Sequence, residues 1–329
     1  MGHPTRPAGA RRQADASVRS VTLDLVVALM GLGLILVAAE RLVAAAVGVA
    51  LAVRLAPFTV AVVFIGFDPE NLFVGASAAR NDSSGIALGS ILGAAMVAVA
   101  LAFGVTALIA PVRIRPAVPS LLAVPAASGA LLAGLALDGR LGRADGAVLV
   151  AGYGLAVGYL WRLGRKGVAI EAEGEAAEAL EHPPSRARAV GWFAVSLGLL
   201  VVGSELLVDR ARDLIDVAGW SETAVGMSII ALAVSVEELA RELPAARAGH
   251  PELAVGNVAG SMLAFFAFNA GVVALVHPID VPDAVVHTQI PIVLGTVVLV
   301  TGLLARGSVS RVGGAALVLC YAAFLVSLL

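Results

Sequence analysis

Long apolar segments recur along the whole chain, and each is long enough to cross a lipid bilayer. A spanning helix needs about 20 apolar residues. Charged, proline and glycine residues divide the chain into ten such segments, at about 22–52, 57–79, 85–110, 119–137, 146–163, 189–217, 222–247, 252–277, 288–305 and 312–329. The sequence therefore predicts an all-α polytopic membrane protein with about ten transmembrane helices.

Composition excludes several other classes of protein. The chain is 59% hydrophobic and 14% charged, whereas soluble domains are about 45–50% apolar and 25% charged. Because the chain is so apolar, we expect the lipid bilayer as a partner. With 22 Lys and Arg against 24 Asp and Glu, the chain has no excess of positive charge, and we expect no nucleic acid as a partner. The single cysteine, Cys320, excludes a disulfide framework. No phosphate-binding loop, nucleophile motif or metal-ligand spacing is present, so we expect neither an enzyme nor a cofactor.

One charged stretch, residues 164–188, interrupts the apolar segments and divides them into two sets of five. We expect residues 1–20 to form a polar, disordered leader. Two five-helix units follow, at 21–163 and 189–329, and a solvated central loop at 164–188 joins them. Basic residues number 11 on the side of this loop and 7 on the other, or 9 if Arg210 and Arg212 are included. This difference favours a cytoplasmic loop in an integral protein of the plasma membrane. The oligomeric state stays undefined.

The two halves repeat each other. Residues 66–111 align without a gap on residues 233–278, and 14 of the 46 positions are identical. Matches of Ala, Val and Leu mean little in so apolar a chain. The matched Glu, Arg, Pro and three Gly residues are more specific, and they include Glu70 with Glu237 and Pro111 with Pro278. A unit with an odd number of spans inserts in the opposite sense the second time, and inverted repeats of this kind are a transporter architecture.

Carboxylates inside the repeated helices mark the candidate site. The first copy has Asp68 and Glu70, and the second has Glu237 and Glu238. A carboxylate at membrane depth costs at least about 2.5–3.5 kcal/mol, which makes each one a candidate functional residue. Pro69 interrupts the first helix and frees backbone carbonyls that could also coordinate a cation.

Spacing brings an acid and a neutral oxygen together in each copy. Asp68 and Asn71 are three residues apart, and Ser235 and Glu238 occupy the same two positions in the second copy. Brought together by the pseudo-two-fold axis, these four side chains would form an oxygen-rich cage of charge −2. Such a cage suits a hard cation or protons.

Glu70 and Glu237 form a second matched pair, turned about 100° round the helix from their neighbours. Arg241 follows Glu237 at the favourable i, i+4 spacing. The sequence supports an ion pair with Arg241 and a role in ion or proton transfer equally well. No basic residue follows Glu70 at that spacing, which favours a functional role there.

Polar residues on the following helix add to the second copy. Asn257, Ser261, Phe265 and Asn269 recur at steps of four, so on an α-helix they form a slowly turning stripe. Their counterparts are Ser90, Ala94, Ala98 and Ala102. Asn257 and Ser90 could equally serve tight helix packing beside Gly256 and Gly89. We expect Ser261 and Asn269 to line a polar cavity.

These residues resemble the sodium/calcium exchanger membrane domain of the cation/calcium antiporter superfamily. The resemblance covers most of residues 22–329. It is clearest at Gly203-Ser204-Glu205-Leu206-Leu207-Val208, at Ser221-Glu222-Thr223-Ala224-Val225-Gly226 and at Gly256-Asn257-Val258-Ala259-Gly260-Ser261. It implies two inverted five-helix repeats whose polar side chains bind transported Na⁺ or Ca²⁺.

Several ligand positions of the family are altered. The position of the family's acid falls on Asn71 in the first copy and on Glu238 in the second. The serine before it falls on Asp68 and Ser235. Two further ligand positions fall on Ala94 and Ser261, and on Ala98 and Phe265.

We therefore expect a secondary cation antiporter whose ion-binding residues differ from those of the family, with Asp68 and Glu238 as the central cation ligands. Calcium, sodium and protons all remain candidate substrates. A non-transporting membrane sensor or assembly protein on the same scaffold is the alternative.

Overall fold

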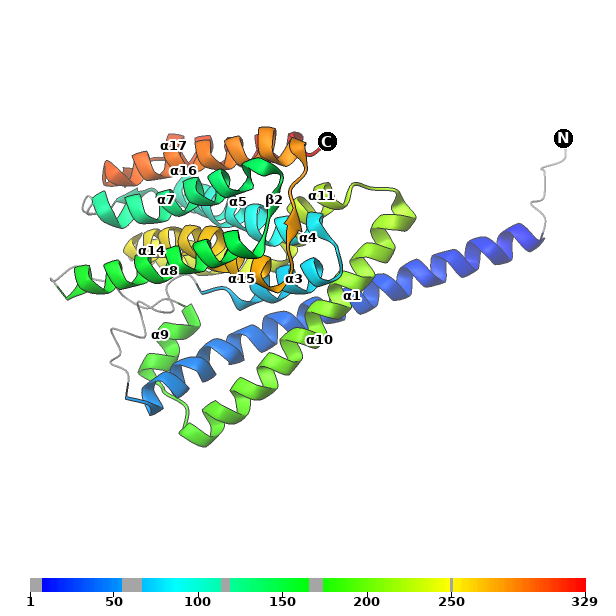
Figure 1. Cartoon of the computed structure of the whole chain (residues 1–329), viewed down its shortest axis with the longest axis horizontal. Helices are drawn as coiled ribbons and strands as arrows, with labels where there is room; N and C mark the ends of the chain where they lie inside the picture. The colour runs from blue at the N-terminus through cyan, green and yellow to red at the C-terminus, as the bar shows by residue number, and fades with distance from the viewer. Residues whose placement is uncertain (1–7, 55–66, 114–118, 166–173, 249–250) are drawn as a thin grey trace.

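We describe the chain from a computed structural model, over residues 8–54, 67–113, 119–165, 174–248 and 251–329. Helices make up almost all of this part (Figure 1). The helices of the first half are α1 (Ala8–Ala52), α3 (Pro69–Arg80), α4 (Ser84–Leu88), η1 (Gly89–Gly93), α5 (Ala94–Met96), η2 (Val97–Ala102), α6 (Phe103–Ile109), α7 (Pro119–Leu135), η3 (Ala136–Asp138) and α8 (Arg143–Gly164). From α4 to α6 they form one continuous run that contains two π-helical turns, η1 and η2.

The second half has the same kind of organisation. Its helices are α9 (Gly174–Glu181), α10 (Arg186–Ala218), α11 (Glu222–Val225), η4 (Gly226–Ile230), α12 (Ala231–Val234), α13 (Val236–Arg247), α14 (Pro251–Leu263), η5 (Ala264–Asn269), α15 (Ala270–Val276), η6 (Val285–Gln289), α16 (Ile290–Ala305) and α17 (Arg311–Val326). Here η4, η5 and η6 are π-helical.

The boundaries of the elements repeat with the sequence. Helix α3 begins at Pro69 and ends at Arg80, and α13 begins at Val236 and ends at Arg247, each 167 residues later. The same offset relates η2 to η5 and α6 to α15. The internal repeat is therefore present in the fold as well as in the residues.

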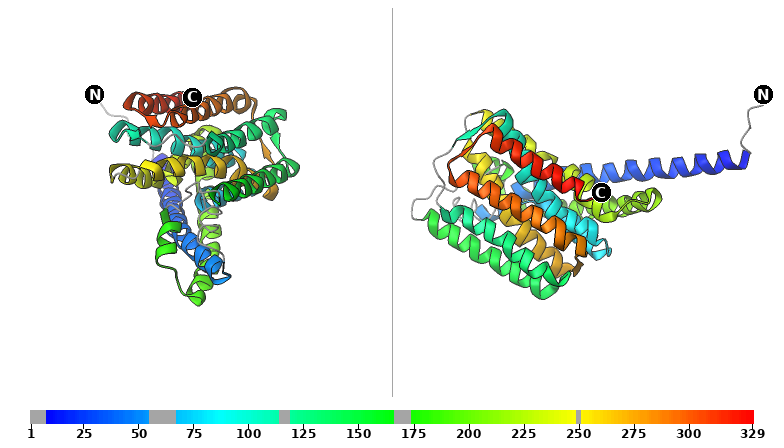
Figure 2. Two further views of the ribbon diagram at one scale, coloured as in Figure 1. Left: turned by 90° about the vertical axis from the view of Figure 1, so that its left-hand side faces the viewer. Right: turned by 90° about the horizontal axis from the view of Figure 1, so that it is seen from above.

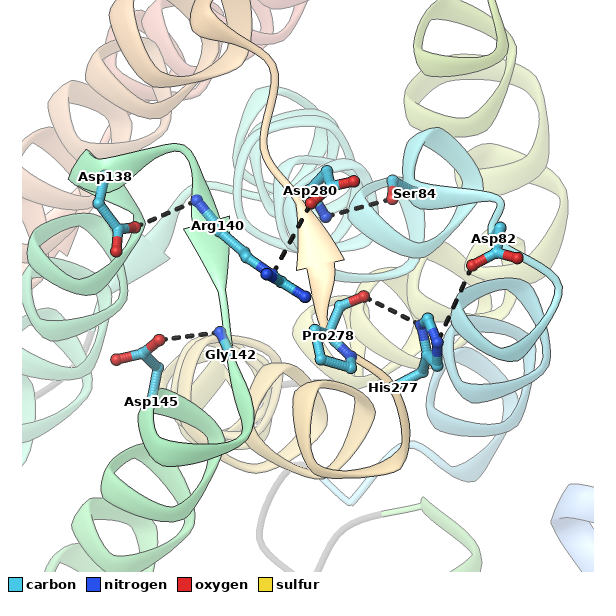
Figure 3. A network of polar contacts seen from close by, with 9 residues as sticks. All are labelled: Asp82, Ser84, Asp138, Arg140, Gly142, Asp145, His277, Pro278 and Asp280. Atoms are coloured by element: carbon cyan, nitrogen blue, oxygen red, sulfur yellow. Dashed lines mark hydrogen bonds and ion pairs between the residues drawn. The ribbon is translucent and has the colours of Figure 1, made fainter.

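Two short sheets join the halves. Strand β1 (Val112–Arg113) pairs with β4 (Ser308–Val309), and β2 (Arg140–Leu141) pairs with β3 (Ile279–Asp280), both antiparallel. Each sheet takes one strand from each half. Around the β2–β3 pair, Arg140 lies 3.9 Å from the Asp280 carboxylate (Figure 3). The Asp280 N–H also donates to the Ser84 hydroxyl at 3.2 Å, so polar contacts hold the repeats together at this end of the molecule (Figure 3).

The matched helices form the core of the molecule. The most apolar stretch of the Ser84–Ile109 run is 94% buried, and that of Leu253–Val276 is 78% buried. In the other four candidate spans the buried share is only 22–39%. The two central runs therefore place their polar side chains inside protein, whereas the outer helices carry the apolar surface. Helices α1 and α10 pack against each other and project from the rest (Figures 1 and 2).

The predicted count of about ten spans is not confirmed in the described part of the chain. Within the described residues, six helices are long and apolar enough to cross a membrane, or seven if the bent pair Glu222–Val234 and Val236–Arg247 is one span. Helices Leu122–Asp138 and Arg311–Val326 are apolar but shorter. Much of the expected span at 57–79 lies outside the described residues.

Two expectations for the polar segments were wrong. Residues 8–20 are not irregular, because α1 already begins at Ala8. The central loop is not only a solvated linker, since it contains α9, whose Ala179 is 4% exposed and packs against Val43 and Val47 of α1. The boundaries of the two five-helix units stay predictions.

Candidate functional site

A helix begins at matched positions in the two repeats, directly after Asp68 in the first and directly after Ser235 in the second. Helix α3 starts directly after Asp68, with Pro69 in its first turn, where the missing N–H of proline costs nothing. In the second copy, α12 and α13 meet at Ser235 with a bend of 40°. These two helix starts bring polar side chains of both repeats together inside the protein.

The first group of polar side chains joins the two repeats. Asp68 caps α3, since its Oδ1 accepts from the Asn71 backbone N–H at 2.8 Å. The Asn71 side-chain Nδ2 donates to Asp68 Oδ2 at 2.9 Å and to Ser235 Oγ at 3.0 Å. All three residues are at most 4% exposed. Asn71 Oδ1 has no hydrogen-bond partner among the described residues, so this buried oxygen is available to a ligand.

The second group lies on α13 and α14. The Asn257 Nδ2 donates to Glu238 Oε2 at 2.5 Å and to Glu242 Oε1 at 3.0 Å. One amide nitrogen therefore holds two carboxylates that are one helical turn apart. The Glu238 N–H also donates to the Ser235 carbonyl at 3.2 Å, which connects this group to the first.

Glu242 is a residue that the sequence reasoning missed. It is 1% exposed and contacts the same amide as Glu238. Glu242 has no polar counterpart in the first copy, where Gly75 occupies the matched position. Gly75 lies against Ser90, the counterpart of Asn257, so closely that an added Cβ would be 2.2 Å from Ser90 Oγ. The second repeat therefore has a hydrogen bond between Asn257 and Glu242 where the first repeat has close packing of Ser90 on Gly75. The i, i+4 spacing from Glu238 was the available signal.

The remaining predicted residues lie in the core, with different surroundings. Glu70 is 2% exposed, whereas its counterpart Glu237 is half-buried. The Arg241 side chain lies outside the described part of the structure, so the proposed ion pair with Glu237 stays a prediction. Ser261 is 2% exposed, and Asn269 is fully buried with no hydrogen-bond partner for its amide among the described residues.

The expected polar stripe does not follow simple α-helical spacing. Asn257 and Ser261 lie on α14, but Phe265 and Asn269 belong to the π-helical η5. A π turn closes over five residues instead of four, so the stripe changes direction at Ala264. Irregular turns of this kind occur often at functional sites.

Close contact between the repeats continues on the neighbouring helices. A Cβ added to Gly89 would lie 2.2 Å from the backbone oxygen of Gly226, so η1 and η4 meet through their backbones. At the start of α4, the Glu222 Oε1 accepts from the Gly85 N–H at 2.8 Å and from the Ile86 N–H at 3.3 Å. A carboxylate of the second repeat thereby caps a helix of the first.

The site is rich in oxygen and buried acid. Asp68, Glu70, Glu238 and Glu242 are each at most 4% exposed. Carboxylate, amide and hydroxyl oxygens are the ligands of hard cations. No group of three or more His, Cys, Asp or Glu in the described part of the chain is arranged to hold a metal ion. The oxygens of the site thus come from carboxylate, amide and hydroxyl groups together.

The sequence is similar to those of known membrane and transport proteins. The Inner membrane protein YrbG of Escherichia coli (strain K12) is 29% identical over 265 residues, which cover 76% of this chain and 79% of YrbG. The Putative antiporter CaxA of Alkalimonas amylolytica is 29% identical over 258 residues, covering 76% of this chain and 80% of its own.

The fold has a match among solved structures. A structure of the sodium-calcium exchanger NCX_Mj has a TM-score of 0.59 at 21% identity, and the match covers 92% of this chain and 97% of that one. At this identity the likeness concerns the fold alone. The family model described as sodium/calcium exchanger protein matches residues 23–162 and 188–329. Because these two ranges are most of both halves, the chain belongs to the sodium/calcium exchanger family.

Proposed function

We propose that the chain is a secondary cation antiporter that exchanges Na⁺, Ca²⁺ or H⁺ by alternating access. Asp68 and Glu238 are its central cation ligands in this proposal. The observation that carries it is the contact between Asn71 Nδ2 and Ser235 Oγ, at 3.0 Å. This contact joins the two repeats inside the protein, beside the matched helix starts at Asp68 and Ser235. Transporters built from inverted repeats bind their substrates at such a place.

Further ligands follow from burial. Asn71 Oδ1 faces no hydrogen-bond partner among the described residues. Glu70, Ser261 and Asn269 are buried in the two core helical runs or beside them, and Asn257 holds the acid of the second repeat. Glu237 is half-buried and lies at the edge of this set. The break at Ser235, between α12 and α13, supplies backbone carbonyls as additional oxygen ligands.

The number of oxygen ligands in the site bears on which ion it binds. Calcium takes about 6–8 oxygen ligands. The Asp68–Asn71–Ser235 group has fewer side-chain oxygens than this, so calcium binding requires Glu238, backbone carbonyls or water as well. Buried carboxylates can also bind sodium or protons. The site supports monovalent or proton exchange as well as calcium exchange.

Alternating access assigns a role to the contacts between repeats. Glu222 and the β2–β3 contacts join the repeats at one end of the molecule, where β2 lies in Figure 1. In this proposal these contacts close that end of the molecule in one conformation of the transport cycle. They separate in the other conformation, in which that end is open. We place the central loop, 164–188, on the cytoplasmic side of the plasma membrane.

Flux across proteoliposomes tests the proposal. Purified protein is reconstituted, and Ca²⁺ uptake is measured against Na⁺, H⁺ or no counter-gradient in separate vesicles. We expect uptake to require one counter-gradient. Asp68→Asn and Glu238→Gln should each abolish it, whereas Asp283→Asn, an exposed acid outside the site, should not. Exchange that persists in both site variants would refute the site.

Absence of flux for every ion pair, in vesicles that contain folded protein, would refute antiport. It would favour the non-transporting alternative.

A further inference from the structure

A polar hollow lies away from the proposed cation site, between α1, the end of α9 and the start of α10. Its volume is about 500 Å³. The polar residues that line it include Glu40, Arg41, Glu178, His182, Arg188 and Trp192. None of these belongs to the helices that carry Asp68 or Glu238, so the proposed antiport does not account for the hollow.

Tight packing fixes the walls of the hollow. Helix α9 rests on α1 through Ala179, which is 4% exposed, and Val47, which is fully buried. The chain that follows α9 is pressed against α1, because a Cβ on Gly48 would lie 2.7 Å from Pro184 Cγ. The hollow is thus part of the packed structure.

The charges in the hollow are of both signs. Arg41 and Arg188 face it together with Glu40 and Glu178. A simple anion meets two carboxylates there and a simple cation meets two guanidinium groups. A ligand that carries both a negative and a positive group satisfies all four, since guanidinium binds phosphate strongly and a carboxylate accepts from ammonium.

The position of the hollow points to a lipid. It lies at the first turns of α10, where the chain passes from the charged residues 164–188 into the candidate span Arg186–Ala218. Trp192 and Phe193 are 42% and 36% exposed there. Aromatic side chains of this kind gather at the level of lipid headgroups. The natural ligand of both charges at this depth is a zwitterionic phospholipid.

The aromatic ring decides between the common zwitterionic headgroups. Choline has no N–H to donate and is recognised by the open faces of aromatic rings. The Arg41 guanidinium already lies 5.6 Å from the centre of the Trp192 ring and covers one face of it. A primary ammonium donates hydrogen bonds to the two glutamates instead. We propose that the hollow binds the headgroup of phosphatidylethanolamine, with phosphate between Arg41 and Arg188 and ammonium toward Glu40 and Glu178.

Lipid retention measured by native mass spectrometry tests this proposal. Delipidated protein in detergent is incubated with phosphatidylethanolamine, phosphatidylcholine or phosphatidylglycerol, each with and without inorganic phosphate. We expect retention of phosphatidylethanolamine about tenfold above that of phosphatidylcholine, the effect of about one charge-assisted hydrogen bond. Inorganic phosphate should not displace it. Equal retention of the two zwitterionic lipids, or displacement by phosphate alone, would overturn the proposal.

Variants separate the hollow from general effects of charge. Arg41→Gln with Arg188→Gln should abolish retention of phosphatidylethanolamine, because both groups that bind its phosphate are lost. Arg165→Gln is the matched control, because Arg165 also lies over a tryptophan, 4.9 Å from the Trp161 ring, but outside the hollow. Equal loss in the control would contradict the assignment.

A second double variant should change which lipid the protein prefers, a result that misfolding would not produce. Glu40→Gln with Glu178→Gln removes the two negative charges at the ammonium position and keeps the two arginines at the phosphate position. The preference should then move from phosphatidylethanolamine to the anionic phosphatidylglycerol. An unchanged preference would show that the glutamates do not contact the headgroup.

Discussion

The hydrogen bonds of Asn71 to its two partners predict how the stability of a single substitution compares with that of a double substitution. Asn71→Asp turns a donor into an acceptor, so the bond to Asp68 Oδ2 loses its donor, whereas the Ser235 hydroxyl can donate to the new carboxylate. A hydrogen bond to a charged group contributes about 1.5–3 kcal/mol. The single exchange should therefore lower the free energy of unfolding by about 1.5–3 kcal/mol.

A second exchange should restore most of this stability. In the double variant Asp68→Asn, Asn71→Asp, the amide at position 68 donates to the carboxylate at 71, and the Ser235 hydroxyl donates to the same carboxylate. The cap of α3 survives because Asn caps a helix as well as Asp does. The two positions should show a coupling energy of at least about 1 kcal/mol, as expected for residues in one hydrogen-bond network.

Thermal unfolding in detergent measures this order. A thiol-reactive dye reports on Cys320, the single cysteine, which is half-buried in α17. We expect the wild type to unfold at the highest temperature, the double variant next, and Asn71→Asp lowest. A double variant no more stable than Asn71→Asp would refute the assigned hydrogen bonds.

Three further exchanges test other contacts. Asn257→Ala removes the one donor shared by two buried carboxylates, and unfolding should show a loss of about 3–5 kcal/mol; a loss no larger than that of Ser261→Ala would contradict the shared bond. Gly89→Ala places a Cβ 2.2 Å from a backbone oxygen and should destabilise the protein by about 1–3 kcal/mol; Gly134→Ala, with nothing within 4 Å, is the control. Glu222→Ala removes the acceptor of two N–H groups and should cost about 0.5–2 kcal/mol; an unchanged melting temperature would show that the contact contributes nothing.

Sequence periodicity predicted the helical segments and the repeat because both depend on residue type alone. The offset of 167 residues at Pro69 and Val236 recurs in the helix boundaries. The family resemblance was also visible, and the family model confirms it. Burial of polar residues inside matched helices followed from the cost of carboxylates in lipid.

Other features depend on tertiary contacts that no local pattern shows. Glu242 has a glycine as its counterpart, so the comparison of repeats passed over it. The π turn of η5 redirects the stripe at Asn269, yet its residues are ordinary helix formers. Helix α9 lies in an acidic segment that reads as solvated, but Ala179 packs on α1. In each case the packing partner is distant in sequence.

Anomalous X-ray diffraction from crystals soaked with Sr²⁺ would locate the cation directly. Sr²⁺ is a hard cation that binds oxygen ligands as Ca²⁺ does. We expect one strong peak bounded by the side chains of Asp68, Asn71, Ser235 and Glu238, and its loss in Asp68→Asn crystals. A peak bound only elsewhere, or a peak that Asp68→Asn leaves unchanged, would contradict the proposal that the matched helix starts at Asp68 and Ser235 form the transport site.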